Sequence, residues 1–329
     1  MRNLLFRFVK HSTSLKPSDV AVHVVDPNVD FRRVFDNIEE LQKNLNKRKI
    51  GKMQVSELAR KYGRWWKVYE DFEGKSDQNE KRELKHALLE EEKGLIEILK
   101  LPNFLDSSHF LDEEVDRKKI YGFEKSSSMT RTTDSLENCI FNNFSPIRLD
   151  PPRMVRPAIT EAFNYGSSEV IRFHEGQNPA MHLVGVSPPG LLVSFVSTKF
   201  SSTNSFPLVF LAKGTGYNRI YKGWQKEFVS MAVIGREKKE VDGKLAEIAW
   251  SLEELFHSSK LSKLEPDELK PYESSGAVIK MDGKVLTRIS SAGTYLSERL
   301  KIVTNGEKYL YIGFVEIDVD CLYSRKDIK

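Results

Sequence analysis

Residue types that could support acid–base, nucleophilic or phosphate chemistry are sparse in this sequence. It contains no glycine-rich phosphate loop, no His-Glu-x-x-His pair and no Gly-x-Ser-x-Gly nucleophile turn. The seven histidines are scattered, and His182, beside an apolar segment, fits a hydrogen-bonded core residue better than a ligand. The glycines of "GTGYNR" (residues 214–219) are too loosely spaced to indicate a function. These residues predict no catalytic group, no metal ligand and no cofactor.

One interrupted apolar segment has the form of a pocket wall. In "HLVGVSPPGLLVSF" (residues 182–195), the apolar stretches 183–186 and 191–195 are expected to be buried strand. Pro188 and Pro189 between them remove two backbone donors, so an ordinary central strand cannot run through. The interruption offers no carboxylate, base or metal ligand. We expect it to line a pocket without chemistry of its own.

A basic run is the strongest signal for a binding surface. Nine Lys or Arg residues and one acid, Glu57, lie between Leu41 and Lys67. A run of one charge sign favours phosphate contact, although many such runs are only solvated helix faces, and both interpretations stay open. We name the predicted RNA-binding residues the basic stripe: Lys43, Lys47, Arg48, Lys49, Lys52, Arg60, Arg64 and Lys67.

The stripe lies in a segment with helical periodicity, Asp26 to Lys100. Apolar residues recur there at spacings of three and four, which predicts packed helices. They are Phe31, Val34, Ile38, Leu41 and Leu45; then Val55, Leu58, Tyr62, Trp65, Tyr69 and Phe72; then Leu84, Leu88, Leu95 and Leu99. Residues 74–76 supply a turn between the last two helices. We expect an antiparallel coiled-coil arm over residues 26–102.

Residues 103–329 have a different pattern, in which short apolar runs alternate with turns. Strand-like runs outnumber helices, which favours a mainly antiparallel sheet with flanking helices. "GKLAEIAWSLEELF" (residues 243–256) is one predicted helix, and the charged segment 235–244 before it is expected to be an exposed hairpin tip. The fold class is therefore α+β, with an arm and a sheet domain.

The net charge of +4 arises within the first eighteen residues, which carry four basic residues and no acid. Basic residues opposite a leucine- and phenylalanine-bearing face are typical of a mitochondrial presequence, here assigned to residues 1–25; a frayed basic tail is the alternative. The two cysteines have no metal-type spacing and fit a reduced compartment. No apolar run is long enough to span a bilayer. The predicted location is the mitochondrial matrix, without membrane contact.

Six segments, in order, resemble the seryl-tRNA synthetase family, among them the interrupted segment 182–195 and "TNG" (304–306), which looks like the family's "LNG". "ILKLPNF" (98–104) resembles the "IPNLP" that ends the family's arm, and "SLENCIFNNFSPIRLDPPRMVRP" (135–157) resembles the first class II motif. "FPLVFLAKGTGYNR" (206–219) is similar to "LPLRYAAFGTCFR" at the second motif, and "RISSAGTYLSERLKI" (288–302) to "EISNCTDFQARRLNI" before the third. The resemblance implies an arm joined to a class II synthetase-like domain.

The resemblance also implies that the family's ligand-binding groups are missing. The interrupted segment matches the family's "LIGTSEVPL", in which the threonine and glutamate hold the ammonium group of serine; Val186 and Pro188 stand there. A second serine-binding glutamate falls near Ala232. Because an ammonium group requires an anionic partner, serine binding in the family's manner is not expected.

The positions that contact ATP differ as well. Asn218, or Arg219 after a one-residue slip, replaces the second-motif arginine, and Ile220 or Tyr221 replaces its glutamate. At the third motif, Gly313 or Phe314 stands where the family has arginine. Adenylation requires cations that stabilise charge on the phosphates. We therefore expect no synthetase activity and no catalytic residue.

The first-motif segment is also expected to form a dimer interface. Its apolar residues are Leu136, Ile140, Phe141, Phe144, Ile147 and Leu149. They exceed what one short helix and strand normally bury alone, although a place in the core beneath the sheet is the alternative. The resemblance implies two partners for this surface, a second copy or the genuine mitochondrial seryl-tRNA synthetase. We favour the heterodimer.

Three functions remain open from the sequence. The favoured one is a non-catalytic paralogue of mitochondrial seryl-tRNA synthetase that binds the synthetase and RNA, with tRNA as a candidate, and supports mitochondrial translation. The second is a stand-alone nucleic-acid-binding accessory factor in mitochondria. The third is an ATP-dependent ligase for another acid.

Overall fold

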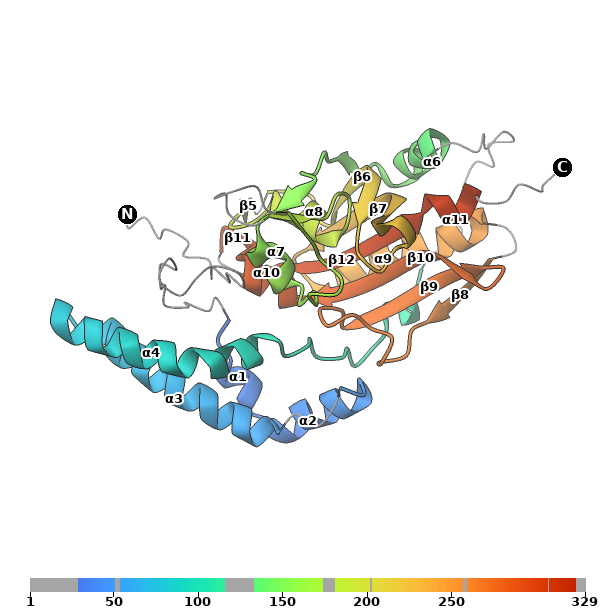
Figure 1. The fold of residues 1–329 in the computed structure, drawn as a ribbon. Helices are drawn as coiled ribbons and strands as arrows, with labels where there is room; N and C mark the ends of the chain where they lie inside the picture. Colours follow the sequence, from blue (N-terminus) through green and yellow to red (C-terminus); the bar gives the residue numbers. More distant parts are fainter. Residues whose placement is uncertain are drawn as a thin grey trace. The chain divides into compact units, whose positions relative to one another are not determined.

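The computed structural model describes residues 29–50, 54–115, 133–173, 181–201, 203–256, 259–306 and 308–323. The chain divides into two compact units between Phe104 and Leu105 (Figure 1). The predicted presequence and Lys52 of the basic stripe lie outside the described residues. Within the described part of the chain, no helix has both the length and the apolar character needed to cross a membrane.

The N-terminal unit consists of α1 (Arg32–Phe35), α2 (Ile38–Lys47), α3 (Val55–Gly74) and α4 (Gln78–Leu99). Helices α3 and α4 lie along each other as a helical hairpin (Figure 1). Asn37 separates α1 from α2 because its side-chain oxygen accepts the Glu40 N–H at 3.1 Å and so caps α2. Asp77 caps α4 in the same way. The turn predicted near residues 74–76 is therefore set by a specific cap.

The core of the N-terminal unit is built from most of the periodic apolar residues predicted from the sequence, although Ile38 is 39% exposed and is not part of it. Trp65 is 1% exposed and stacks on Tyr69, with ring centroids 4.9 Å apart. The Tyr62 hydroxyl accepts the Phe31 N–H at 3.2 Å, which attaches the segment before α1 to α3. Other fully enclosed side chains come from α2, α3 and α4: Leu41, Leu45, Leu58, Leu88 and Leu95.

A seven-stranded sheet forms the C-terminal unit (Figure 1). Its order is β1 (Ile147–Arg148), β6 (Leu208–Tyr217), β7 (Gln225–Gly235), β12 (Tyr311–Asp318), β10 (Lys284–Gly293), β9 (Ser275–Met281) and β8 (Ser259–Lys263). All neighbouring strands are antiparallel except the edge pair β1 and β6, which is parallel. The predicted α+β class is confirmed.

Two apolar layers cover the sheet, one on each face. Helices α6 (Thr133–Phe144) and α9 (Lys238–Leu255) pack on one face, here named the α9 face, against residues such as Val233 and Val315. Helices α7 (Pro157–Ala162), α8 (Pro188–Val193) and α10 (Tyr295–Leu300) contribute to the layer on the other, the α8 face, with Ala232 and Phe314. This division follows from the alternation of side chains along a strand.

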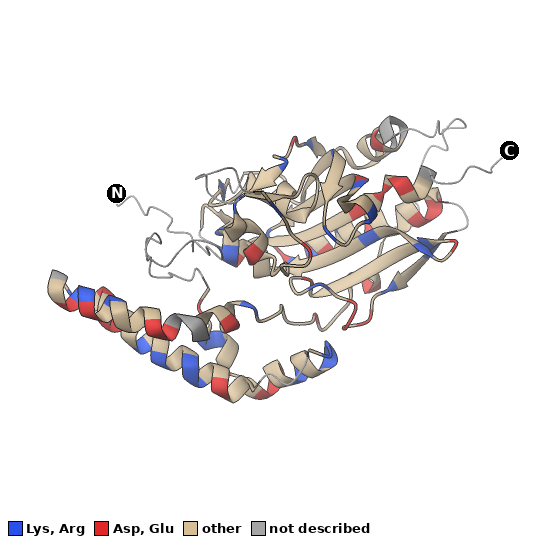
Figure 2. Ribbon diagram, in the orientation of Figure 1, with Lys and Arg blue, Asp and Glu red and all other residues tan. Residues whose placement is uncertain are grey.

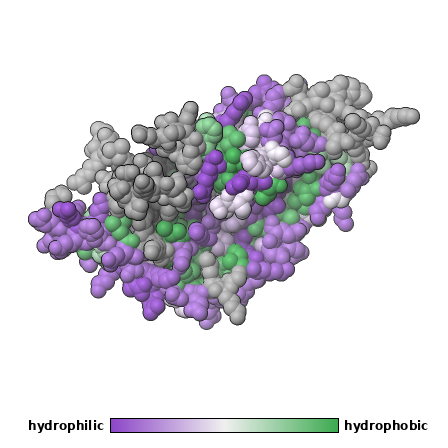
Figure 3. All heavy atoms as spheres, viewed as in Figure 1, coloured by the Kyte–Doolittle hydropathy of each residue, from purple (hydrophilic) through white to green (hydrophobic). Residues whose placement is uncertain are grey.

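The remaining elements surround this sheet. They are the three-stranded sheet β2 (Met154–Val155), β4 (Met181–Leu183), β3 (Ile171–Phe173); the parallel pair β5 (Lys199–Phe200) and β11 (Val303–Thr304); helix α11 (Val319–Tyr323); and the 3₁₀ turns η1 (Phe110–Asp112) and η2 (Lys222–Trp224). The molecular face drawn in Figure 3 is mainly hydrophilic, with its hydrophobic residues in separate patches.

Two local predictions were wrong. The segment 191–195, expected to be strand, lies mostly in α8, because Pro188 and Pro189 occupy the first helical positions, where a missing N–H costs nothing. The predicted hairpin tip at 235–244 is instead largely the start of α9, which begins at Lys238. A capping box between Glu237 and Glu240 starts that helix five residues before the predicted one.

Three backbone segments meet around Gly185 and Gly190. Gly185 has φ of +58°, and a Cβ there would lie 1.9 Å from the Thr215 carbonyl oxygen. A Cβ on Gly190 would lie 1.9 Å from the Gly185 carbonyl oxygen. Both positions therefore require glycine, which allows the segment before α8 to lie directly on β6 and the first turn of α8 to lie against that segment.

Candidate functional site

The positions that the family resemblance assigns to serine binding lie at the start of α8. Val186 is buried, and its N–H donates to the Thr215 carbonyl oxygen at 3.2 Å. Pro188 is buried in the first turn of the helix. Between them, the buried Ser187 hydroxyl has no hydrogen-bond partner among the described residues. No side chain of this segment supplies the anion that an ammonium group requires.

The turn between β6 and β7 holds the second-motif positions. Asn218 is buried, and its side-chain oxygen accepts the Ile220 N–H at 3.0 Å. Arg219 is exposed, with its guanidinium 5.6 Å from the centroid of the Trp224 ring. Tyr221 packs toward Phe228, at 5.7 Å between ring centroids. The arginine nearest to the family's phosphate clamp therefore contacts an exposed tryptophan.

The remaining assigned positions are packed in apolar layers. Ala232 on β7 is fully buried and pairs with Phe210 on one side and Phe314 on the other. Phe314 meets Tyr272 edge-on, with centroids 5.9 Å apart and an interplanar angle of 87°. Gly313 points to the α9 face, where a Cβ would lie 2.6 Å from a Leu245 methyl carbon. The backbone at Gly313 therefore leaves no room for an arginine without rearrangement.

A buried polar cluster, which the sequence analysis did not identify, lies on the α8 face. Arg288 of β10 donates from Nε to Glu273 Oε1 at 2.9 Å and makes a second, shorter contact from Nη2 to the other oxygen. Lys270 Nζ lies 3.2 Å from Glu316 Oε2. Glu273 is fully buried, and the Glu316 side chain is 9% exposed. Each of these carboxylates therefore has a cation within contact distance.

The electrostatics of this cluster favour a structural role over proton transfer. Burial alone would raise the pKa of Glu273, but the attraction and hydrogen bonds of Arg288 hold that pKa below its usual value. Burial raises the pKa of both Tyr165 and Tyr272, and the charge of Glu316 acts in the same direction. A carboxylate with a lowered pKa is a weak base, so Glu273 is poorly suited to accept a proton near neutral pH.

The sequence contained one signal for this cluster. In the segment that resembles "EISNCTDFQARRLNI", Arg288 stands where the family's segment begins with glutamate. This reversal of charge requires an acid nearby in a buried site, and Glu273 supplies it fifteen residues earlier. His182 was predicted correctly as a core residue: it is 6% exposed and lies 2.7 Å from the Thr160 hydroxyl through Nδ1.

The predicted dimer interface is only partly exposed, which corrects the sequence interpretation. Leu136, Ile140 and Phe144 are buried in the chain's own layer on the α9 face, because α6 packs on the sheet. Leu149 is half-buried in the layer on the α8 face. The two exposed members are Phe141 (37%) and Ile147 (50%). Phe141 is also covered in part by Arg148, whose guanidinium lies 4.8 Å from its ring centroid.

The basic stripe forms two exposed groups in the N-terminal unit (Figure 2). Lys43 and Lys47 lie on α2, with Lys49 just after it, and Arg60, Arg64 and Lys67 lie on α3. Arg64 Nε contacts Glu91 Oε1 of α4 at 3.2 Å, which neutralises part of the α3 group. Among the described residues, no ion pair engages Lys43, Lys47, Arg60 or Lys67.

Arg48 does not belong to this surface. It was predicted to contact RNA, but it is only 5% exposed. The residue directly follows the last turn of α2, where its N–H caps the Asn44 and Asn46 carbonyls and its side chain is enclosed by the unit. Burial therefore removes Arg48 from the set of residues that can contact a phosphate in this conformation.

The fold places the C-terminal unit among class II synthetase-like structures, with an antiparallel sheet, a parallel edge strand and helices on both faces. No model of a known protein family matches the sequence, and a search of curated proteins finds no match.

Two of the similar structures are seryl-tRNA synthetases. The cytoplasmic serine-tRNA ligase of Naegleria fowleri, solved with AMP, has a TM-score of 0.64 at 10% identity, over 87% of this chain and 89% of that one. The seryl-tRNA synthetase of Pyrococcus horikoshii, solved with ATP, has a TM-score of 0.63 at 14% identity, over 89% and 92%. At these identities the similarity shows the fold, and it supports the resemblance expected from the sequence.

Proposed function

We propose that this chain is a non-catalytic mitochondrial paralogue of seryl-tRNA synthetase, akin to the seryl-tRNA synthetase-like mitochondrial proteins of insects. It acts as a structural or regulatory partner of the mitochondrial synthetase and binds RNA through its arm, in support of mitochondrial translation. The observation that carries the proposal is the set of side chains at the family's ligand-binding positions. Val186, Pro188, Ala232 and Phe314 are apolar and enclosed.

The missing groups account for the expected loss of activity. A charge-assisted hydrogen bond contributes about 1.5–3 kcal/mol, and removing one group that stabilises transition-state charge costs about a hundredfold or more in rate. Loss of the ammonium carboxylate and both phosphate-binding arginines combines several such effects. The test is ATP–pyrophosphate exchange with serine and the other amino acids, beside the mitochondrial seryl-tRNA synthetase as positive control. We expect background exchange.

Exchange above background would give a different result for each alternative. Exchange with serine would remove the proposal of a non-catalytic paralogue. Exchange with another acid would promote the third hypothesis, an ATP-dependent ligase. No residue described above favours that ligase, since the buried carboxylates at Glu273 and Glu316 already contact Arg288 and Lys270.

The partner is proposed to be the mitochondrial seryl-tRNA synthetase, with a second copy of this chain as the alternative. The exposed apolar residues Phe141 and Ile147 near the parallel sheet edge support an interface there. Co-expression followed by size exclusion with light scattering should give a one-to-one complex. Ile147→Lys should weaken the complex, whereas Val285→Lys, at an exposed valine on β10, should not. Separate homodimers that never exchange subunits would contradict the heterodimer.

A stand-alone nucleic-acid-binding accessory factor is the second candidate. The exposed cations Lys43, Lys47, Arg60 and Lys67, which form no ion pair with any described residue, support RNA binding under either proposal. A pull-down from mitochondria distinguishes the two. Stoichiometric recovery of the synthetase favours the paralogue, and recovery of RNA without a synthetase favours the accessory factor.

A further inference from the structure

The three-stranded sheet of β2, β4 and β3 carries apolar residues on both of its faces. Its register aligns the three strands, and side chains alternate between the two faces along each strand. Val155 and His182 point to one face and are 2% and 6% exposed, so this face is buried. We name the opposite one the outer face. Its members are Met154, Ile171, Phe173, Met181 and Leu183.

The outer face is open to solvent. Met154 is 42% exposed and Phe173 is 53% exposed, and the other three members are half-buried. None of the five belongs to an apolar core layer of the described residues. An antiparallel sheet that faces water usually carries polar side chains on that side. A continuous apolar face is instead typical of a surface that a partner covers.

Three exposed arginines border the outer face. Arg153 and Arg156 flank β2, and Arg172 lies on β3. Among the described residues, no ion pair engages Arg153 or Arg156. The described residues of the three strands and their immediate neighbours contain no acid and no lysine. Arginine, methionine and aromatic residues are enriched in protein–protein interfaces, whereas lysine is depleted, so this composition favours a protein as the occupant.

The arginines also distinguish a second copy from a different protein. A symmetric pair would bring the outer faces of two copies together, so three arginines from each copy would meet at one interface. Like charges that face each other oppose association, whereas opposite charges favour it. The occupant that fits is therefore an apolar patch bordered by Asp or Glu side chains, on a protein other than this chain.

We propose that the outer face binds such a carboxylate-bordered patch on the mitochondrial seryl-tRNA synthetase. Met154 and Phe173 supply the apolar contacts, and Arg153 and Arg156 orient the two chains. The inference rests on the proposed heterodimer. It extends the interface beyond Ile147, seven residues before Met154, and it gives a reason for the synthetase to be preferred over a second copy.

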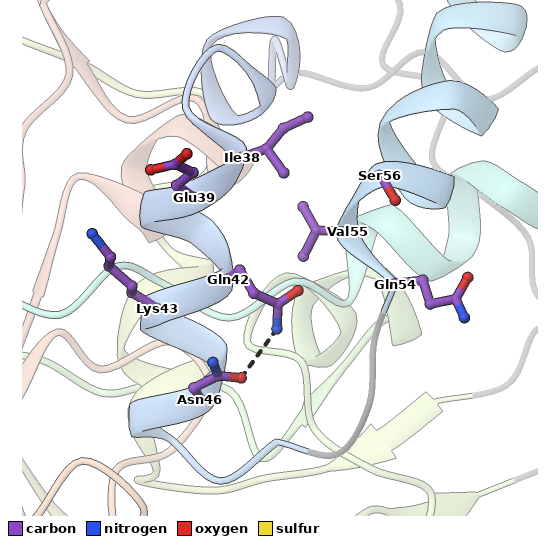
Figure 4. A pocket seen from close by; sticks show the side chains of 8 residues that line it. All are labelled: Ile38, Glu39, Gln42, Lys43, Asn46, Gln54, Val55 and Ser56. Atoms are coloured by element: carbon purple, nitrogen blue, oxygen red, sulfur yellow. Dashed lines mark hydrogen bonds between the residues drawn. The ribbon is translucent and has the colours of Figure 1, made fainter.

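Two exposed apolar residues elsewhere lack such surroundings and serve as controls. Ile38 is 39% exposed at an open groove of about 590 Å³ between α2 and the start of α3 (Figure 4). The other lining residues of that groove are polar except Val55, which is buried, and Glu39 and Lys43 point away from the space between the helices. Val285 on β10 is 45% exposed and follows an exposed lysine.

Dissociation of the co-expressed complex on dilution, followed by light scattering with both full-length chains, tests the apolar contacts. The double variant Met154→Ser/Phe173→Ser should raise the Kd about a hundredfold, at about tenfold for each exposed apolar residue. The matched control Ile38→Ser/Val285→Ser removes two apolar side chains of similar exposure and should leave the Kd unchanged.

A second variant, Arg153→Glu/Arg156→Glu, tests the charges without changing the apolar face. It should also weaken the complex, and more strongly at low salt than at high salt. The same reversal at Lys280 on β9 and Lys284 on β10, two exposed lysines, is the control for net charge and should have no effect.

The outcomes separate this inference from the proposed heterodimer. A complex of unchanged affinity in both variants would overturn the role of the outer face and leave the heterodimer intact. A homodimer that the serine variant dissociates would show that a second copy covers the face, which also overturns the inference. Weaker RNA binding by the arginine variant with an unchanged complex would assign the arginines to RNA and overturn it as well. Absence of any complex between the wild-type chain and the synthetase would overturn both proposals together.

Discussion

Removing the charge of Arg288 should strongly destabilise the C-terminal unit. Arg288 holds Glu273 through two contacts and donates from Nη2 to the Glu268 carbonyl oxygen at 3.0 Å. The change Arg288→Met keeps most of the side-chain length and leaves Glu273 fully buried without its guanidinium partner. Removal of one partner from a buried ion pair costs about 3–5 kcal/mol.

The lower end of this range applies because the Arg288 side chain is 21% exposed and water can reach part of the site. A loss of about 3 kcal/mol corresponds to a fall in melting temperature of about 6–12 °C for a domain of this size. Urea unfolding and thermal unfolding of the full-length protein at neutral pH measure both quantities. The double variant Arg288→Met/Glu273→Leu should be more stable than Arg288→Met alone, because it leaves no buried carboxylate without a cation; Glu316 keeps Lys270.

The pH dependence gives an independent check on the same pair. The pKa of Glu273 is lowered in the folded state, so its contribution to stability is present above pH 4.5 and is lost as the pH falls through the folded pKa. In Arg288→Met, burial without the cation should raise the pKa of Glu273, so its protonation at lower pH removes the unpaired buried charge. The difference in unfolding free energy between wild type and variant should therefore shrink as the pH falls. Additive effects of the two single changes, or a difference independent of pH, would refute this account.

Three further predictions concern other parts of the chain. Charge reversal at Arg60, Arg64 and Lys67 should make RNA affinity less dependent on salt. The slope of log affinity against log salt concentration should fall by up to about 2, at about 0.7 per phosphate contact. The same reversal at Lys81, Arg82 and Lys85 on α4 is the control, and an equal effect there would show that only net charge matters. Burial lowers the pKa of His109, whose neutral ring accepts the Leu111 N–H and contacts the Gly276 carbonyl oxygen, so stability is present above pH 6.5 and lost as the pH falls to the folded pKa. His109→Gln should remove this dependence in urea unfolding, and an unchanged pH profile would contradict it. Gly313→Ala should lower the free energy of unfolding by about 1–3 kcal/mol, because the Leu245 side chain on α9 must move. An unchanged melting temperature would show that Leu245 can shift without cost.

The sequence predicted well those features that depend on local periodicity. The buried positions of Leu45, Leu58 and Trp65 follow from helical spacing alone. The α+β class follows from the count of strand-like runs. The start of α8 was missed because two prolines can mark either a break in a strand or the first turn of a helix. Pro188 and Pro189 begin a helix here. That outcome depends on the close packing of Gly185 and Gly190, which the sequence does not show.

Features that depend on tertiary partners could not be read from the sequence. Arg48 stands in a run of lysines, and nothing in its neighbours distinguishes a buried arginine from exposed ones. Leu136 and Ile140 are apolar residues of a kind found in interfaces, but α6 buries both of them against the chain's own sheet. The pairing of Arg288 with Glu273 joins β10 to the segment just before β9, and only the strand register brings the two together.

The close backbone approach at Gly185, Gly190 and Thr215 determines where this segment can diverge. A side chain at either glycine would collide with a main-chain oxygen, so substitution there would disrupt the fold regardless of what the protein binds. Val186 and Pro188 are buried side chains without polar groups, so packing alone constrains them. The backbone arrangement can in this way be shared with synthetase structures at only 10–14% identity. Chains that share this segment should then be recognised more readily by the Gly-x4-Gly spacing than by polar residues beside it.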